Sequence, residues 1–150
     1  VLLSPLPSAG ALVLAVDGPV EHARMVRAYD DAAGVTAAFN LNVLNVVNRT
    51  LGASFDATAF RHRAVFNAEA SRIEMHLVSQ HAQAIALGTG QVLRLQASEH
   101  IVTEHSYKHA PARAEQLLRG AGFDQLQRFG IDGEAYGVYL ARIGHAESER

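Results

Sequence analysis

The sequence predicts an α/β fold in which half of a nucleotide-type sheet is interrupted by an extra module. Residues 11–16 form a continuous apolar run that ends at Asp17, as is typical of a strand buried on both faces of such a sheet. Residues 60–103 read as strands of a small antiparallel sheet. A helix and two strands follow Lys108, so the α/β pattern resumes and closes the chain.

The composition is that of a soluble globular protein. With 150 residues, of which 49% are hydrophobic and 19% charged, the chain can bury a substantial core as one domain or a large part of one. A net charge of -2 and a pI of about 6.5 offer no basic surface for nucleic acid or an anionic membrane. The absence of cysteine excludes disulfides, cysteine-bound zinc and a thiol nucleophile, and it fits the cytoplasm.

The first 16 residues are apolar enough to be mistaken for a signal peptide or a membrane span. They have no basic leader, contain Pro5 and Pro7, and meet Asp17 before about 20 apolar residues have passed. We therefore expect no targeting segment and no membrane span. Because the chain starts abruptly and without an initiator methionine, we expect it to be a piece of a longer protein.

Residues 19–51 predict two helices. Pro19 suits a first helical turn, Gly34 separates or bends the two helices, and Gly52 ends the second. Apolar side chains four residues apart mark one stripe of the second helix: Phe39, Val43, Val47 and Leu51. The asparagines of this helix are expected to mix exposed and inter-helix hydrogen-bonding positions: Asn40, Asn42, Asn45 and Asn48.

The elements after these helices follow from alternation and turn residues. In order, they are a strand at 72–79, a turn at 88–90, an extended run at 91–102, a helix at 111–119 and strands at 126–131 and 136–143. Asp132-Gly133 between the last two strands is a hairpin signal, which predicts an antiparallel edge to the sheet. A frayed tail is expected over residues 146–150.

A polar hexapeptide, residues 103–108, follows the extended run. If the strand continues through it, Glu104 and Ser106 share one face and their odd-numbered neighbours share the other. A carboxylate beside a hydroxyl suits a small polar ligand that carries a donor of its own. A solvated strand face is the alternative interpretation.

The sequence contains no glycine-rich loop between a first strand and a helix, which is where a sheet of this type holds a nucleotide cofactor. Residues 88–90 lie between two expected strands, and Gly130 and Gly137 belong to the closing hairpin. These residues therefore predict no cofactor site in this chain.

Four segments carry a resemblance to a known family: AYDDAAGVTAAFNLN at 28–42, RHR at 61–63, RIEMHL at 72–77 and TEHSYK at 103–108. Together they resemble the histidine-specific, S-adenosylmethionine-dependent methyltransferases that make Nα-trimethylhistidine, the hercynine of ergothioneine biosynthesis. The resemblance runs from Gly10 to Ile143, and it corresponds to the C-terminal half of the family's length.

The resemblance implies the second half of a Rossmann-like class I methyltransferase sheet with an inserted α+β substrate-binding module. The implied divisions are a core strand at 1–18, the module's helices and antiparallel sheet at 19–107, a helix and terminal β-hairpin of the core at 108–145, and the tail at 146–150. S-adenosylmethionine is the implied methyl donor, and its site is expected in an N-terminal half that lies upstream.

The resemblance also implies a site for L-histidine. It implies that Tyr29 binds the α-carboxylate and that Met75 packs against the substrate. It implies that Glu104 and Ser106 bind the imidazole, a chemically sensible role because a carboxylate accepts a ring N–H and a hydroxyl serves the other ring nitrogen. The reaction implied is displacement at the donor's methyl group by the neutral α-amine, for which proximity and alignment matter more than a strong base. No catalytic residue and no cofactor-binding residue is therefore assigned to this chain, and we expect it to be inactive by itself.

Two other interpretations remain open. A metal-binding β module could use side chains in or near the strands: His76, His100, Glu104, His105 and His109. The chain could also be a non-catalytic remnant, or a subunit that needs an N-terminal partner.

Single residues outside the proposed site also have expected roles. Asp30 and Asp31 point about 100° apart on a helix, so capping or solvation is expected instead of shared metal binding. Lys108 is expected to be a surface charge. His105 and His109 depart from the family's pattern beside the imidazole-binding pair.

Overall fold

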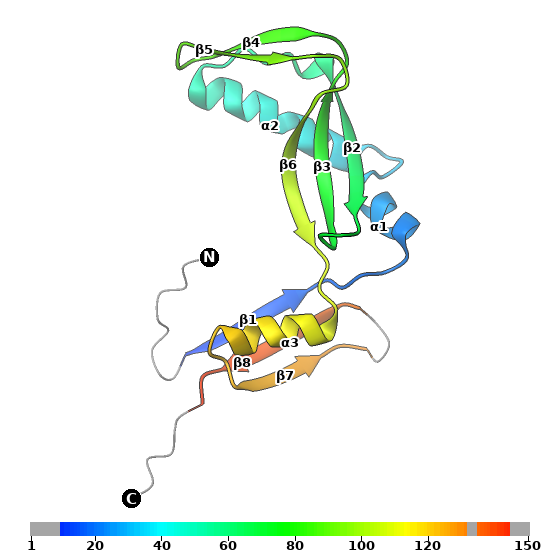
Figure 1. Cartoon of the computed structure of the whole chain (residues 1–150), viewed down its shortest axis with the longest axis vertical. Helices are drawn as coiled ribbons and strands as arrows, with labels where there is room; N and C mark the ends of the chain where they lie inside the picture. The colour runs from blue at the N-terminus through cyan, green and yellow to red at the C-terminus, as the bar shows by residue number, and fades with distance from the viewer. Residues whose placement is uncertain (1–9, 132–134, 145–150) are drawn as a thin grey trace, which may run out of the picture. The chain divides into compact units, whose positions relative to one another are not determined.

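A computed structural model describes residues 10–131 and 135–144 of the chain. The chain forms two compact units, whose elements are shown in Figure 1. The first unit takes in the chain up to Val20 and from Tyr107 onward, and the second unit is Glu21–Ser106. The first unit has one sheet and the second unit has a three-stranded sheet and a two-stranded hairpin, and the pairs β1–β8, β7–β8, β2–β3 and β4–β5 are antiparallel. The fold is a mixed α/β arrangement, which confirms the broad fold class.

The first unit is a three-stranded sheet with a helix on one face. Its strands lie in the order β1 (Ala11–Val16), β8 (Gly137–Arg142) and β7 (Gln125–Phe129). Helix α3 (Pro111–Gly120) carries proline in its first turn, where the missing N–H has no partner to lose. The helix and the sheet share one core cluster: Ala114, Leu118, Phe123, Tyr139 and Ala141.

Strand β1 is not buried on both faces, so that prediction was wrong. Val13 is 69% exposed, and Leu12 and Val16 are half-buried against the core under α3. Within residues 10–131 and 135–144, β1 pairs only with β8, and the core cluster of this unit lies on the α3 side of the sheet. Among the described residues, no strand therefore pairs with the other edge of β1, and Val13 points away from α3.

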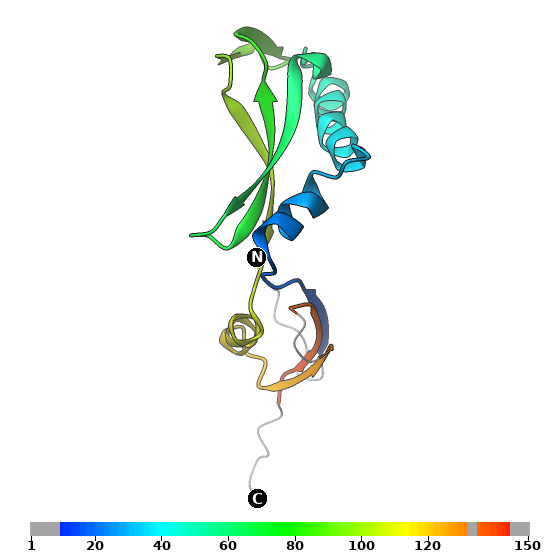
Figure 2. The same cartoon turned by 90° about the vertical axis from the view of Figure 1, so that its right-hand side faces the viewer.

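The second unit places two helices on one side of a three-stranded sheet. The sheet has the order β2 (Phe60–Asn67), β3 (Arg72–Ser79) and β6 (His100–Tyr107). Helices α1 (His22–Tyr29) and α2 (Val35–Leu51) lie on the same side of it, as Figure 2 shows. The contacts of α1 with β2 and β3, and of α2 with the same two strands, agree with this view.

A hairpin and a short helical turn extend this unit: β4 (Gln83–Leu87), β5 (Gln91–Leu95) and η1 (Ala57–Ala59). Leu44 of α2 is buried in a cluster that joins the sheet to this hairpin through Phe60, Leu77, Ile85 and Leu95. Burial of an aliphatic side chain of this size stabilises a fold by about 1.5–3 kcal/mol. The cluster therefore holds the helix, the sheet and the hairpin together.

The predicted division of the helical segment is confirmed. Gly34 precedes α2 and Gly52 ends it, with φ angles of 72° and 66° that disfavour any residue with a Cβ. Asp31 caps α2 with a carboxylate that accepts the N–H groups of Thr36 at 2.8 Å and Val35 at 3.1 Å. These bonds, led by those of Thr36, lower the pKa of Asp31 to about 2. The capping interpretation of the aspartate pair is confirmed for Asp31.

Two expectations for the helices were wrong. Pro19 does not open a helix, because α1 begins at His22. The predicted apolar stripe of α2 does not face the sheet, since Phe39 is 65% exposed and Leu51 is 59% exposed. The buried residues of α2 are instead Asn40 and Leu44. Asn40, the polar residue that follows Phe39, is therefore buried in place of the expected apolar side chain.

The strands largely follow the predicted order. β3 has the predicted bounds, and residues 88–90 form the predicted turn. The extended run at 91–102 is interrupted, because β5 ends at Leu95 and a turn with Ser98 at φ 70° precedes β6. β7 and β8 pair antiparallel, as the hairpin signal predicted. The Asp132-Gly133 turn, the tail at 146–150 and the chain before Gly10 lie outside the described residues.

Asn48 ties the end of α2 to the loop that follows it. Its amide accepts the N–H of Phe55 and donates to the carbonyl of Phe55, both at 2.8 Å. We expect Asn48→Ala to lower the free energy of unfolding by about 1–3 kcal/mol, because it removes two partly buried hydrogen bonds. Asn45 is exposed on the same helix, so Asn45→Ala should stay within about 0.5 kcal/mol. Equal urea midpoints for the two variants would contradict this account.

Candidate functional site

The side chains predicted to bind histidine all belong to the second unit, Glu21–Ser106. Tyr29 is the last residue of α1, Met75 lies on β3, and Glu104 and Ser106 lie on β6. The hexapeptide is extended as predicted as far as Tyr107, where β6 ends. Residues that are far apart in sequence are therefore supplied by one helix and two strands of the same sheet.

Tyr29 and Ser106 are in direct contact. Their hydroxyl groups lie 2.6 Å apart in a hydrogen bond in which either can donate, and both residues are half-buried. In the implied roles, Tyr29 binds the α-carboxylate of histidine and Ser106 binds its imidazole ring. These two groups are at opposite ends of the amino acid. A histidine bound in that way would therefore have to separate the two hydroxyls.

Glu104 and Met75 differ sharply in exposure. Glu104 is exposed and makes no hydrogen bond or ion pair with any other described residue, so its carboxylate is available to accept a donor. Met75 is only 3% exposed and offers little surface to a ligand. The hydroxyl of Thr103, the residue before Glu104, lies 2.9 Å from the Met75 carbonyl. This contact brings β6 and β3 together beside the predicted site.

A buried polar layer lies between α2 and the sheet, and the sequence did not single out its members as a group. Asn40 is fully buried and contacts His62 on β2 and Thr103 on β6 through side-chain hydrogen bonds. His62 also contacts the backbone carbonyl of Tyr29 at 2.7 Å. The available signal was the position of Asn40 one helical turn before Leu44, on the face of α2 that is buried.

A charged cluster lies along β3 and its neighbour β2. Glu74 accepts hydrogen bonds from Arg72 at 2.7 Å, from His76 at 3.1 Å and from Asn67 at 3.0 Å. These donors, with Arg72 the strongest, lower the pKa of Glu74 to about 2. Burial lowers the pKa of His76, and its ring stacks on that of His100 with 4.2 Å between centroids. Glu74 is therefore held ionised next to a neutral imidazole.

The metal-binding interpretation finds no set of ligands in the described structure. No group of three or more histidine, aspartate or glutamate side chains is gathered there in a way that could hold a metal ion. His76 and His100 stack ring on ring, and Glu74 is already engaged by Arg72. Nothing in this arrangement favours the metal-binding alternative.

Lys108 is not a surface charge, contrary to the prediction. Its side chain is 2% exposed, and its ammonium group lies 2.7 Å from the carboxylate of Asp17, just past the end of β1. The carbonyl of Asp17 also accepts the N–H of His109 at 3.0 Å. The ion pair and the backbone bond join the end of β1 to the segment before α3, because an ammonium this well buried needs a charged partner.

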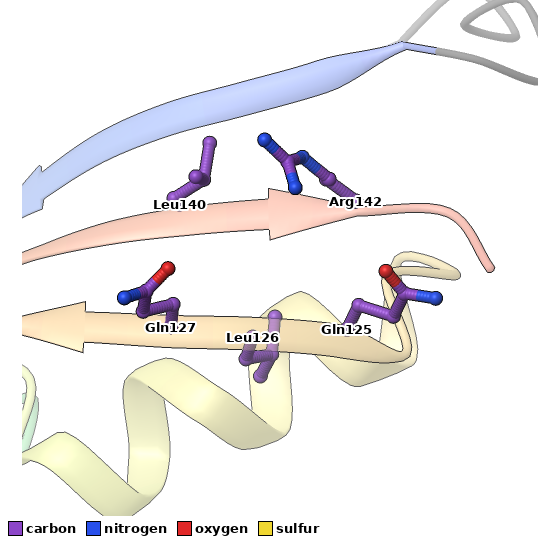
Figure 3. Close-up of a pocket in the computed structure, with 5 residues that line it drawn as sticks. All are labelled: Gln125, Leu126, Gln127, Leu140 and Arg142. Atoms are coloured by element: carbon purple, nitrogen blue, oxygen red, sulfur yellow. The ribbon is translucent and has the colours of Figure 1, made fainter.

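Described residues of the first unit line hollows of two kinds. One, of about 390 Å³, is apolar and lies between β1 and α3, with Leu12, Leu14 and Leu117 among its lining residues. The other, of about 200 Å³, is a shallow polar hollow on the sheet (Figure 3): Gln125, Leu126, Gln127, Leu140 and Arg142. In the described part of the chain, no glycine-rich loop joins a strand to a helix at either hollow. These residues do not form a fitting site for a nucleotide-like methyl donor.

Among the described helices, none has the length and apolar character to cross a membrane.

Comparison with known proteins decides the family. The sequence profile described as "Histidine-specific methyltransferase, SAM-dependent" matches residues 2–143. The chain belongs to this family. The resemblance inferred from the four sequence segments is thereby confirmed.

Two curated relatives agree with membership of the histidine-specific methyltransferases. The chain is 41% identical over 141 residues to the histidine N-alpha-methyltransferase of Mycolicibacterium smegmatis, covering 93% of this chain and 44% of the relative. It is 39% identical over 132 residues to the histidine N-alpha-methyltransferase of Mycobacterium tuberculosis, covering 87% of this chain and 41% of the relative. The chain thus spans less than half the length of the curated relatives that it matches.

The environment of Glu74 predicts a pH dependence of stability in this methyltransferase chain. Its folded pKa of about 2 lies below the usual 4.5, so the ionised form is favoured by folding. The resulting stability is present above pH 4.5 and is lost as the pH falls toward 2. Glu74→Gln should therefore lower the urea midpoint at neutral pH, and the difference from the unaltered chain should shrink on acidification.

Glu69→Gln is the matched control for this titration, because Glu69 is an exposed carboxylate near the same strands. Its urea midpoint should follow that of the unaltered chain at every pH. A constant offset between Glu74→Gln and the unaltered chain across the acid range would show that ionisation of Glu74 does not stabilise the fold.

Proposed function

We propose that this chain is the substrate-binding C-terminal part of an enzyme that transfers methyl groups from S-adenosylmethionine to the α-amine of L-histidine, with Nα-trimethylhistidine (hercynine) as the product. The observation that carries this proposal is the Tyr29–Ser106 hydroxyl pair beside the exposed Glu104, in a chain of the histidine-specific family. The names of both curated relatives agree with histidine as the substrate.

The chemistry of the side chains suits an amino acid with an imidazole ring. Glu104 can accept a ring N–H in a charge-assisted bond, and Ser106 can serve the second ring nitrogen. Tyr29 can donate its hydroxyl proton to the α-carboxylate, since exchange of its bond with Ser106 for a bond to a charged acceptor is favourable. An amino acid without the ring donor would leave Glu104 without this bond, which favours histidine over such analogues.

The methyl donor is proposed to bind to an N-terminal portion of the protein, for two reasons. The chain covers less than half of each curated relative. The described residues also offer no glycine-rich loop between a strand and a helix, which is where a sheet of this type holds a nucleotide-like cofactor. The β1-β8-β7 order, with an open edge at β1 in the described chain, would suit the second half of a Rossmann-like sheet. The substrate-binding module at 19–107 and a cytoplasmic location likewise remain predictions.

The contribution of this chain to the reaction is binding and orientation. Histidine held at both ends would present its α-amine in a defined direction, and alignment of this kind supplies a large part of the rate of a two-substrate reaction. None of the four proposed binding residues is required to act as a general base. The proposed roles of Tyr29, Glu104 and Ser106 are therefore those of substrate contacts, whereas Met75, which is 3% exposed, would need a small rearrangement to touch the substrate.

The first test concerns the imidazole contact of Glu104. In the complete enzyme, meaning this chain together with the N-terminal portion of its relatives, Glu104→Ala should weaken histidine binding by about 10- to 150-fold. That range corresponds to the loss of one charge-assisted bond. Donor binding should not change, and the exposed Glu69→Ala should leave both affinities unaltered. Calorimetry that finds the same histidine affinity in Glu104→Ala as in the unaltered enzyme would refute the assignment.

The second test concerns the division of labour. The isolated 150-residue chain should neither bind S-adenosylmethionine in calorimetry nor methylate histidine. Co-expression with an N-terminal portion should restore both properties, because that portion is proposed to hold the donor. Tight donor binding by the isolated chain would overturn this part of the proposal.

A further inference from the structure

We propose that Asn40, His62 and Thr103 form a positioning network that sets the geometry of the histidine-binding residues without touching the substrate. This inference rests on the proposed function, because it assigns the network to the same site. All three residues lie in the second unit, on α2, β2 and β6. They connect the elements that carry Tyr29, Met75, Glu104 and Ser106.

Asn40 is the centre of the network. It is fully buried, and its side-chain oxygen lies 2.6 Å from the Thr103 hydroxyl, which donates to it. Its amide nitrogen lies 2.9 Å from Nδ1 of His62 and, at a longer 3.4 Å, from the carbonyl of His76. Both ends of a buried amide are thus occupied, as the high cost of an unpaired buried polar group requires.

The chemistry of the partners determines the proton position on His62. The amide nitrogen of Asn40 can only donate a hydrogen bond, so Nδ1 of His62 must accept it. The carbonyl of Tyr29 can only accept, so Nε2 of His62 must carry the proton, across a distance of 2.7 Å. His62 is therefore held as one neutral tautomer, with a fixed ring orientation.

The network ends at the backbone of two predicted binding residues. His62 donates to the carbonyl of Tyr29, which lies at the C-terminal end of α1 where helical carbonyls lack helical partners. The single hydroxyl proton of Thr103 is shared between two acceptors, the side-chain oxygen of Asn40 at 2.6 Å and the carbonyl of Met75 at 2.9 Å. Glu104 follows Thr103 directly on β6. A shift of any network member would therefore displace the site from several sides.

The network is polar at a position where apolar side chains would pack more simply. The next buried residue of α2 is Leu44, which lies in a purely hydrophobic cluster. A buried polar group stabilises little more than an apolar one of the same shape, but its directional bonds permit only one arrangement. This polar layer therefore contributes orientation of the site, beyond its contribution to stability.

The test uses isosteric variants of Thr103 in the complete enzyme. Thr103→Val removes the hydroxyl and keeps the shape, and it should raise KM for histidine about five- to tenfold, the effect of one lost hydrogen bond. KM for S-adenosylmethionine should not change. Thr103→Ser keeps the hydroxyl and should restore KM for histidine to near its original value.

A second pair of variants covers the case in which Thr103→Val does not fold. His62→Gln retains an acceptor for Asn40 and a donor for the Tyr29 carbonyl, whereas His62→Leu retains neither. Histidine affinity should therefore be higher in His62→Gln than in His62→Leu by a similar factor. Equal affinities in this pair would overturn the proposal.

Asn48→Ala is the matched control for stability, because Asn48 lies on the same helix and its two bonds reach Phe55 instead of the site. It should lower the urea midpoint and leave KM for histidine unchanged. If Thr103→Val lowers the midpoint in the same way and also leaves KM unchanged, the network is merely structural and the positioning role is refuted.

Glu104→Ala, measured in the same series, separates the two proposals. A loss of histidine affinity in Glu104→Ala with no change in Thr103→Val and no difference between the His62 variants would refute only the positioning network. No change in Glu104→Ala would refute the histidine site itself, whatever the network variants show.

Discussion

The buried amide of Asn40 is the constraint on which the arrangement of the second unit depends. A side chain with two hydrogen-bonding ends, placed at zero exposure in the middle of α2, is tolerated only if both ends find partners. Those partners come from β2, β3 and β6 at once. These bonds fix the position of α2 on the sheet, and His62, which contacts Asn40, also contacts the carbonyl of Tyr29 at the end of α1. The hydroxyl of Tyr29 lies 2.6 Å from that of Ser106 on β6.

The first unit is organised by a different requirement. Its apolar strand β1 is covered by α3 on one side and leaves Val13 69% exposed on the other. The buried ammonium of Lys108 is matched by the carboxylate of Asp17, and this pair anchors the chain beside the end of β1. An exposed apolar edge of a sheet is a hazard for aggregation unless another segment covers it. This is consistent with the proposal that a further portion of the protein completes the sheet.

Prediction from sequence succeeded where local rules are strong. Gly34 and Gly52 divided the helices because left-handed backbone favours glycine, and the alternation of residues 72–79 correctly bounded β3. Prediction from sequence failed where the burial of a side chain depends on partners that are distant along the chain. The apolar spacing of Phe39 and Leu51 suggested an inward stripe, but the sheet and hairpin accept Leu44 and Asn40 instead. Lys108 likewise looked like a surface charge because nothing near it in sequence reveals that it pairs with Asp17, 91 positions away.

The sequence by itself determined most of the order of helices and strands, the family and the chemical types present in the proposed site, since these follow from periodicity, turn residues and ordered motifs. Only the tertiary structure decided that Tyr29 and Ser106 share a hydrogen bond and that Met75 is buried while Glu104 is exposed. It also decided that the buried amide of Asn40 contacts the strand that carries Glu104 and Ser106. The reason is that hydrogen bonds between side chains depend on distances in space, and Tyr29 and Ser106 are separated by 77 positions along the chain. A pattern along the chain specifies which groups are available, and packing decides which of them meet.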